Sequence, residues 1–219
     1  MKEESKLKYI FVELVHHLPF SIFGVILSIL LLGLLSFFVT IMRAQDISAA
    51  AFGELFHIFH PVHILFSAVA TTSMFWKHER SIVKAVFIGF IGSVFICGLS
   101  DIILPFCGGI LLGREMQLHI CFIRHPVLIL TFSSVGILAG LLINKNTRHS
   151  TEYSHSAHVF ISSSASILYL ISYGLTDWTH LIGAVFLIAV FAVMIPCCAS
   201  DIVFPLACTH RACEGKCDE

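Results

Sequence analysis

Charged residues are scarce in this chain. Asp, Glu, Lys and Arg make up 12% of the 219 residues, whereas a soluble domain contains about 25%. Hydrophobic residues supply 57% of the chain, and the mean hydropathy is +0.92. We therefore predict an all-α polytopic membrane protein. The net charge is −1 and there is no basic tail or cluster, so no nucleic-acid partner is expected.

Several signature motifs are also absent from the sequence. There is no glycine-rich phosphate loop, which disfavours ATP-driven pumping by this chain. There is no Gly-x-Ser-x-Gly elbow for serine hydrolysis of that type, and no Cys-x-x-Cys-His motif for covalent c-type haem. The first apolar run follows three lysines and lacks a small-residue cleavage site, which predicts a retained helix rather than a cleaved signal peptide.

Six apolar runs are long enough to cross a bilayer core of about 30 Å, which requires about 20 residues each. The predicted spans are 18–42, 57–76, 82–106, 119–143, 155–174 and 180–206. They form one transmembrane domain, 1–207, followed by a Cys/His-rich tail, 208–219. Outside the spans, Lys and Arg gather on the side of the N-terminus, which predicts a plasma-membrane protein with both termini in the cytoplasm.

A nine-residue motif occurs twice. Cys97-Gly-Leu-Ser-Asp-Ile-Ile-Leu-Pro105 returns as Cys197-Cys-Ala-Ser-Asp-Ile-Val-Phe-Pro205, with identical Cys, Ser, Asp, first Ile and Pro. The match indicates an internal duplication of two halves, 8–110 and 117–207. Because each half contains three predicted spans, the second half enters the membrane from the opposite side. This is the inverted-topology repeat of many secondary transporters.

The remaining pairings between the halves are weaker. In the simplest register they are His17 with His125, and His57-x-x-His60 with His155-x-x-His158. A competing match, of 60–65 with 125–130, contradicts this register and leaves it open. Prolines stand close to candidate ligands in both halves, and each predicts a kinked helix. These prolines are Pro61, Pro105, Pro126 and Pro205.

Histidine is unusually frequent, with 13 residues against 13 Lys and Arg together. Candidate metal ligands lie at both ends of the predicted spans. The outer set is His57, His60, His63, Asp101 and His125. The inner set is His17, His155, His158, Asp201 and Cys197. His119 is expected to be an interfacial residue without a ligand role. If His60 or His158 lies a turn deeper than these spans place it, the two sets become one central site.

Imidazoles at positions i and i+3 share one helix face, so both can reach one ion. With a carboxylate from a neighbouring helix, they form a nitrogen and oxygen set suited to Zn²⁺ or another first-row divalent ion. The tail adds four soft ligands within ten residues, which are Cys208, His210, Cys213 and Cys217. They indicate a second metal-binding tract, with a disordered tail carrying incidental cysteines as the alternative.

The sequence thus favours a transporter, an exporter in the first instance, of a divalent transition-metal ion with zinc foremost. The two ligand sets would hold the ion alternately and exchange protons for it, because ligands must be deprotonated to bind a metal. Two alternatives stay open: an intramembrane zinc-dependent lipid hydrolase, and a haem-binding electron-transfer protein with axial histidines. The expected partners are the metal ion and the lipid bilayer, and a homodimer is one arrangement that the sequence leaves open.

Overall fold

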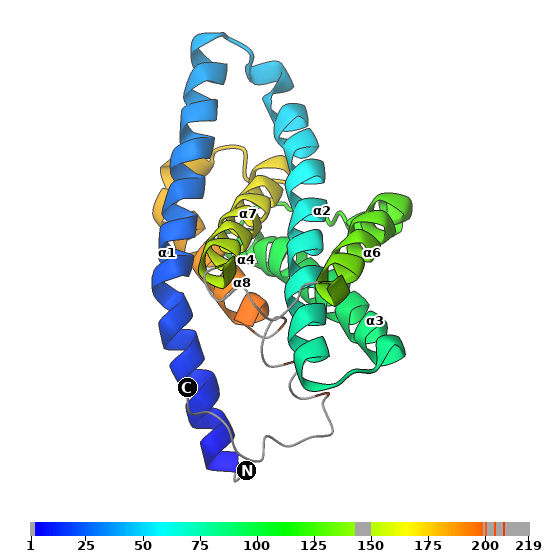
Figure 1. The fold of residues 1–219 in the computed structure, drawn as a ribbon. Coiled ribbons are helices and arrows are strands. Elements are labelled where there is room, and N and C mark those ends of the chain that lie inside the picture. The colour runs from blue at the N-terminus through cyan, green and yellow to red at the C-terminus, as the bar shows by residue number, and fades with distance from the viewer. Residues whose placement is uncertain (1–2, 143–149, 199, 201–203, 205–207, 209–219) are drawn as a thin grey trace.

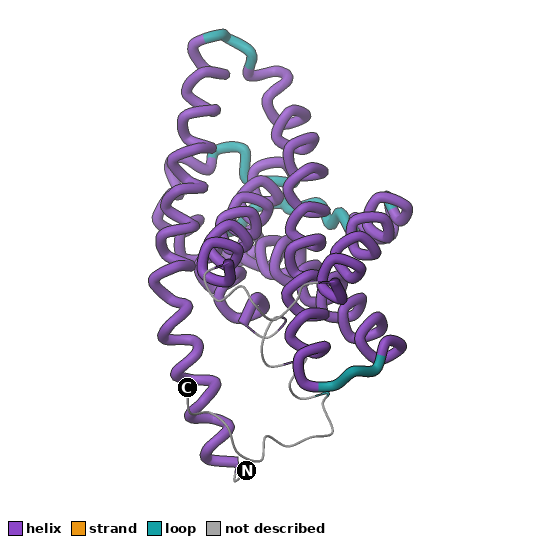
Figure 2. The backbone as a smooth tube through the Cα atoms, in the orientation of Figure 1, coloured by secondary structure: helices purple, strands orange, loops and turns teal. Residues whose placement is uncertain are grey.

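The structure is a computed structural model that describes residues 3–142, 150–198, 200, 204 and 208. Within these residues it is all-helical and contains no strand (Figure 2). The all-α prediction is therefore confirmed.

The first half of the chain contains α1 (Glu3–Ile41), α2 (Gln45–His78), α3 (Ile82–Ile91), the π-helical turns η1 (Gly92–Ile96) and η2 (Leu99–Ile103), and α4 (Leu104–Leu111). The second half contains α5 (Cys121–Arg124), α6 (Pro126–Leu142), α7 (Ser150–Ser172), the 3₁₀ turn η3 (Trp178–Leu181) and α8 (Ile182–Cys198). Among the described connections, those after α1 and α2 are short, and the longest is the stretch 112–120 between α4 and α5 (Figure 1).

Four of these helical stretches are long and apolar enough to cross a membrane: Leu18–Ile41, Ala50–His78, Ile82–Leu111 and Trp178–Cys197. Two shorter apolar helices, Pro126–Leu142 and Ala157–Ser172, fall on the other predicted spans. Large apolar side chains are turned outward, as at Phe23 (64% exposed) and Leu30 (63% exposed) on α1. These features are compatible with a membrane protein, and four of the six predicted spans meet the length requirement.

Helices α2 and α7 form the centre of the bundle. Helix α2 packs against α6, α7 and α3, while α1 packs against α7 and α8. Figure 1 shows α2 and α7 running in opposite directions, with α1 on one side and α6 on the other. Small residues allow the close approach, because a Cβ added at Gly136 of α6 would lie 2.5 Å from the carbonyl oxygen of Leu65 on α2.

The stretch from α3 to α4 is one continuous helix with two π-helical turns. The second turn, η2, immediately precedes Pro105, which stands in the first turn of α4. Proline lacks an N–H and its ring crowds the carbonyl of the residue four positions earlier, here Asp101. The helix predicted to kink at Pro105 has a π-helical turn just before this proline and continues beyond it. The turn carries Ser100 and Asp101 on the buried side of the helix.

The other predicted kinks have different outcomes. Helix α2 continues through Pro61 without interruption. The chain breaks at His125, where α5 has ended and α6 begins with Pro126, so this proline starts a helix instead of kinking one. That position suits proline, because the first helical N–H has no partner within the helix. Pro205 lies outside the described residues.

Candidate functional site

Six polar side chains meet in the interior of the bundle, and we call them the central cluster. They come from α2, from α7, from α8 and from the stretch 97–101, which ends in the η2 turn. Each is at most 4% exposed. The members are His60, His63, Cys97, Asp101, His158 and Cys197.

Asp101 holds two imidazoles in place. Its Oδ2 accepts hydrogen bonds from Nδ1 of His60 (2.8 Å) and from Nδ1 of His63 (2.7 Å). Its Oδ1 accepts a third from the hydroxyl of Ser162 (3.3 Å). Because an ionised carboxylate can only accept, both Nδ1 atoms carry protons. When these rings are neutral, their Nε2 atoms present lone pairs.

Three further groups converge on Nε2 of His63. Nε2 of His158 lies 2.8 Å from it, Sγ of Cys97 3.7 Å and Sγ of Cys197 3.8 Å. The two cysteines are the first residues of the two copies of the repeated motif. The duplicated sequence therefore places one thiol from each half against the same imidazole nitrogen.

This arrangement fits the ligand set of a tetrahedral metal ion. The ligand atoms of His63, His158 and Cys197 all lie within 4.8 Å of one another. Two nitrogens, each at about 2.0–2.1 Å from tetrahedral Zn²⁺, are about 3.4 Å apart. The two rings would have to separate by about half an ångström to admit the ion, and the sulfur-to-nitrogen distance already suits it.

Asp101 stands where a supporting carboxylate is expected. An imidazole that binds a metal commonly donates its other N–H to a carboxylate, which fixes the tautomer and raises the basicity of the ring. Asp101 is 0% exposed, and a buried carboxylate is costly unless a positive charge compensates it. Its ion-pair partners in the described part of the chain are imidazoles. The compensating charge is therefore a proton on these rings or a bound cation.

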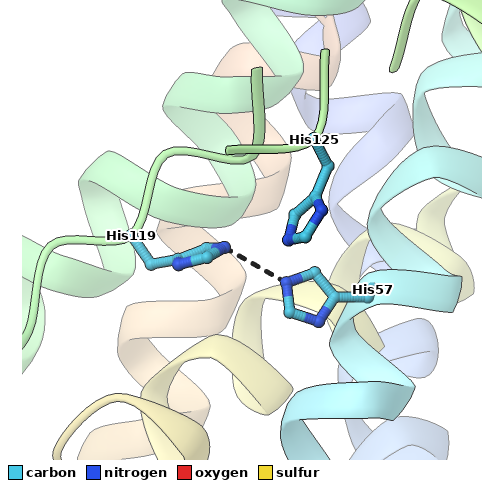
Figure 3. A group of neighbouring side chains, drawn as sticks. All are labelled: His57, His119 and His125. Atoms are coloured by element: carbon cyan, nitrogen blue, oxygen red, sulfur yellow. Dashed lines mark hydrogen bonds between the residues drawn. The ribbon is translucent and has the colours of Figure 1, made fainter. Parts of the chain in front are cut away.

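A second group lies near the connection between α4 and α6, and we call it the histidine trio: His57, His119 and His125 (Figure 3). Nε2 of His57 is 3.1 Å from Nε2 of His119. The rings of His57 and His125 have centroids 4.8 Å apart. His57 and His119 are partly buried and His125 is exposed, so this group is open where the central cluster is closed.

Two tyrosines at the end of α7 and just beyond it hold His119 of the trio in position. The backbone N–H of His119 donates to Oη of Tyr169 (3.1 Å), and this hydroxyl donates to the carbonyl of Gln117 (3.0 Å). The ring of His119 stacks on Tyr173 with centroids 4.8 Å apart and an interplanar angle of 14°. The loop before α5 is thus fixed to the end of α7, which holds the imidazole in one orientation.

His119 stays neutral in this setting. Burial, followed by the neighbouring His57 and His125, lowers the pKa of His119 from its ordinary value of 6.5 to about 4. Arg124 acts in the same direction. One ring nitrogen of His119 therefore has a lone pair for a metal ion at neutral pH.

The structure redistributes the two predicted ligand sets. It brings His63 and Asp101 of the outer set together with His158 and Cys197 of the inner set, so these four residues form one group instead of two. His60 joins them through Asp101, which corresponds to the single central site considered from the sequence. His57 and His125 lie in the trio.

The other predicted ligands have no described contact with either group. Cys208 packs beside the apolar cluster of Phe75, Ala85 and Ile88. The remaining side chains lie outside the described residues, and these are His17, His155, Asp201, His210, Cys213 and Cys217.

Two groups that matter here were not on the predicted ligand list. Cys97 had a sequence signal, because it opens the first copy of the repeated motif. His119 had none, because its partners are brought to it by a loop whose path depends on Tyr169 and Tyr173 of a distant helix.

Comparison with known protein families, with curated proteins and with solved structures finds no match to this chain.

Proposed function

We propose that this chain is an integral membrane transporter of a divalent transition-metal ion, with Zn²⁺ as the foremost substrate and protons as the counter-ion. The observation that carries the proposal is the convergence of His158 and Cys197 on Nε2 of His63, with Asp101 behind that ring. These groups are buried among apolar helices, where polar side chains are costly and commonly line the path of an ion.

The donor atoms select a class of ion. Imidazole nitrogen and cysteine sulfur suit Zn²⁺ and its first-row neighbours, whereas Mg²⁺ and Ca²⁺ prefer oxygen. A thiolate and the Asp101 carboxylate together would balance the charge of a divalent ion within this buried set. The thiol of Cys197 and the imidazoles must lose protons before they bind, so loading the site with metal releases protons. Proton-coupled exchange follows from this chemistry.

The contacts around the central cluster repeat between the two halves of the chain, which supports an inverted repeat with six crossings. Helix α2 carries His63, Ser67 and Thr71, and α7 carries His158, Ser162 and Ser166 at the same spacing of four and eight residues. The two histidines contact each other at the crossing of these antiparallel helices.

The serines next to these histidines make equivalent contacts. Oγ of Ser67 on α2 lies 3.0 Å from Oγ of Ser200 in the second copy of the motif. Oγ of Ser162 on α7 lies 3.2 Å from Oγ of Ser100 in the first copy. Each central helix therefore joins its hydroxyl to the motif of the other half.

The third pair of positions follows the same rule. Oγ1 of Thr71 donates to the carbonyl of Ser200 (3.1 Å), and Oγ of Ser166 donates to the carbonyl of Ser100 (3.3 Å). These contacts favour a register that pairs His63 with His158, in place of the weaker pairing that started from His57. A site on an internal two-fold axis suits alternating access, in which two similar halves rock around a fixed ion.

A zinc-dependent hydrolase acting on lipid is the second candidate, because the trio has three imidazoles and an exposed side. Three protein ligands with a free fourth position are typical of zinc sites that activate water. A haem between His63 and His158 is disfavoured, since it would have to stand between rings whose Nε2 atoms are 2.8 Å apart. Release of fatty acid from bilayer lipid by the purified, zinc-loaded protein, without zinc flux, would favour the hydrolase.

The transport proposal is tested in proteoliposomes that enclose a zinc-sensitive fluorescent indicator, with and without a pH gradient. We expect zinc influx by the parent chain to exceed that of empty liposomes and to respond to the gradient. Cys197→Ser should slow the initial rate at least about tenfold, because it removes a soft ligand. The matched control is Cys107→Ser, since Cys107 is an exposed free cysteine on α4. Flux equal to that of empty liposomes, or equal flux for both variants, would overturn the proposal.

A further inference from the structure

The histidine trio shares no residue with the central cluster, so its arrangement needs an explanation of its own. We propose that His57, His119 and His125 hold a second divalent transition-metal ion, bound more weakly than the ion in the central cluster. This inference goes beyond the proposed transport, because binding at the trio is measured without any flux. Only the comparison of the two affinities rests on the ion proposed for the central cluster.

The three ligand atoms are already gathered. They lie within 4.8 Å of one another and come from three segments: α2, the loop before α5, and the break between α5 and α6. Figure 3 shows the three rings turned toward a common centre. The 3.1 Å between Nε2 of His57 and Nε2 of His119 is close to the about 3.4 Å expected for two nitrogens on tetrahedral Zn²⁺.

Each ring comes from a defined position of the backbone, and the ring of His119 is also held by its neighbours. His119 is fixed by its stacking on Tyr173 and by the bond from its backbone to Tyr169, which is 0% exposed. His57 is on α2, one turn from His60. His125 stands at the break before Pro126, whose fixed backbone angle starts α6. Side chains that are fixed before the ion arrives lose less entropy when they bind it.

The composition of the trio predicts weak and rapidly exchanging binding. Three neutral imidazoles bring no negative charge to a divalent ion, and the Glu54 carboxylate acts on His57 without belonging to the ligand group. The central cluster offers a thiol and a carboxylate. Because His125 is exposed, water can reach the trio and complete the coordination of a bound ion. Nitrogen ligands without an oxygen donor again favour Zn²⁺ over Mg²⁺ or Ca²⁺.

The trio also breaks the repeat that relates the two halves. In the register that pairs His63 with His158, the position equivalent to His57 is Glu152. An imidazole on α2 is thus matched by a carboxylate on α7. The trio joins His57 of the first half to His119 and His125 of the second, and the repeat does not supply an imidazole at the position equivalent to His57.

The experiment titrates the full chain, purified in detergent and stripped of metal, with Co²⁺ and then with Zn²⁺. Bound metal is counted by mass spectrometry, and the sulfur-to-cobalt charge-transfer band reports the thiolate site. We expect the parent to bind two ions per chain, the tighter with the charge-transfer band and the weaker without it. His119→Gln should bind one ion fewer and keep the band unchanged.

His125→Gln is the second variant, because an exposed side chain can be replaced without unfolding the bundle. It should also lose the weaker ion only. The matched control is His180→Gln, since His180 lies on η3 with its side chain 80% exposed. The proposal is overturned if both trio variants bind as many ions as the parent with unchanged affinities. It is also overturned if they lose the charge-transfer band together with the ion.

Discussion

Replacing Asp101 with asparagine isolates the role of its charge. The two side chains have nearly the same size, and the asparagine oxygen can still accept hydrogen bonds from His60 and His63. Its amide can donate to the hydroxyl of Ser162, which now accepts instead of donating. Asp101→Ala would be a poorer test, because it leaves two buried N–H groups unpaired at about 1–3 kcal/mol each, while the Ser162 hydroxyl keeps its contact with Ser100.

The expected magnitude follows from the position of the carboxylate behind His63. Loss of a carboxylate that supports a metal-binding histidine costs about 10–100-fold in metal affinity, which corresponds to about 1.4–2.7 kcal/mol. Removing the charge also leaves a divalent ion less compensated in a buried site. We therefore expect Asp101→Asn to weaken Zn²⁺ binding at the central cluster at least about tenfold, while the thermal unfolding of the metal-free protein is preserved.

The assay is calorimetric titration of detergent-purified protein with Zn²⁺, in competition with a chelator of known affinity. The matched control is Asp177→Asn, because Asp177 precedes η3 with its side chain 58% exposed. An Asp101→Asn protein that binds Zn²⁺ as tightly as the parent would refute the reasoning. A variant whose metal-free form melts far below the parent would show that the carboxylate holds the fold instead of tuning a ligand.

Three further outcomes are expected. Cys197→Ser should abolish the sulfur-to-cobalt charge-transfer band of the Co²⁺-loaded protein, and a retained band would place the thiolate elsewhere. The pKa of His119 is lowered to about 4, so from pH 6.5 downward the unfolded chain binds a proton that the folded chain does not. The melting temperature of the metal-free protein should therefore decrease as the pH is lowered from 7 to 5. His119→Gln should make this decrease smaller. Gly136→Ala should lower the melting temperature, because the added Cβ would lie 2.5 Å from the carbonyl oxygen of Leu65. The control Gly183→Ala has nothing within 4 Å of its added Cβ and should be neutral or slightly stabilising. Equal melting temperatures for the two variants would refute the packing argument.

The sequence was sufficient to predict an all-helical protein with several membrane-length helices, because hydropathy and length depend only on local composition. It could not predict that the span 119–143 is divided into the short helix α5 and the longer helix α6. That division depends on His125 and Pro126, where the chain leaves α5 and starts α6 in a new direction. The π turns around Asp101 were equally out of reach, since only the proline that accompanies them is visible in the sequence.

The identities of the polar residues in the central cluster were predictable, but their grouping was not. Buried ionisable residues in apolar segments stand out by composition alone, as His63, Asp101 and His158 did. Their assignment to one end of a span or the other depended on helix ends that are uncertain by several residues. A shift of one turn along α7 is enough to move His158 from a membrane face to the centre of the bundle, where it meets His63.

One face of α2 connects the two candidate sites. Histidines occupy three successive turns at His57, His60 and His63, and neighbours at this spacing are about 5–6 Å apart at Cβ. The first belongs to the trio, the second bonds Asp101, and the third belongs to the central ligand set. Three imidazoles thus follow α2 from the trio to the central cluster.

The sequence of α7 repeats this spacing with one difference. With His158 as the counterpart of His63, the positions of His60 and His57 correspond to His155 and Glu152. Under the proposed repeat, the outermost position therefore has an imidazole in one half and a carboxylate in the other. A carboxylate carries a negative charge at neutral pH and an imidazole does not, so the sequence itself predicts that the two halves differ in charge at that position.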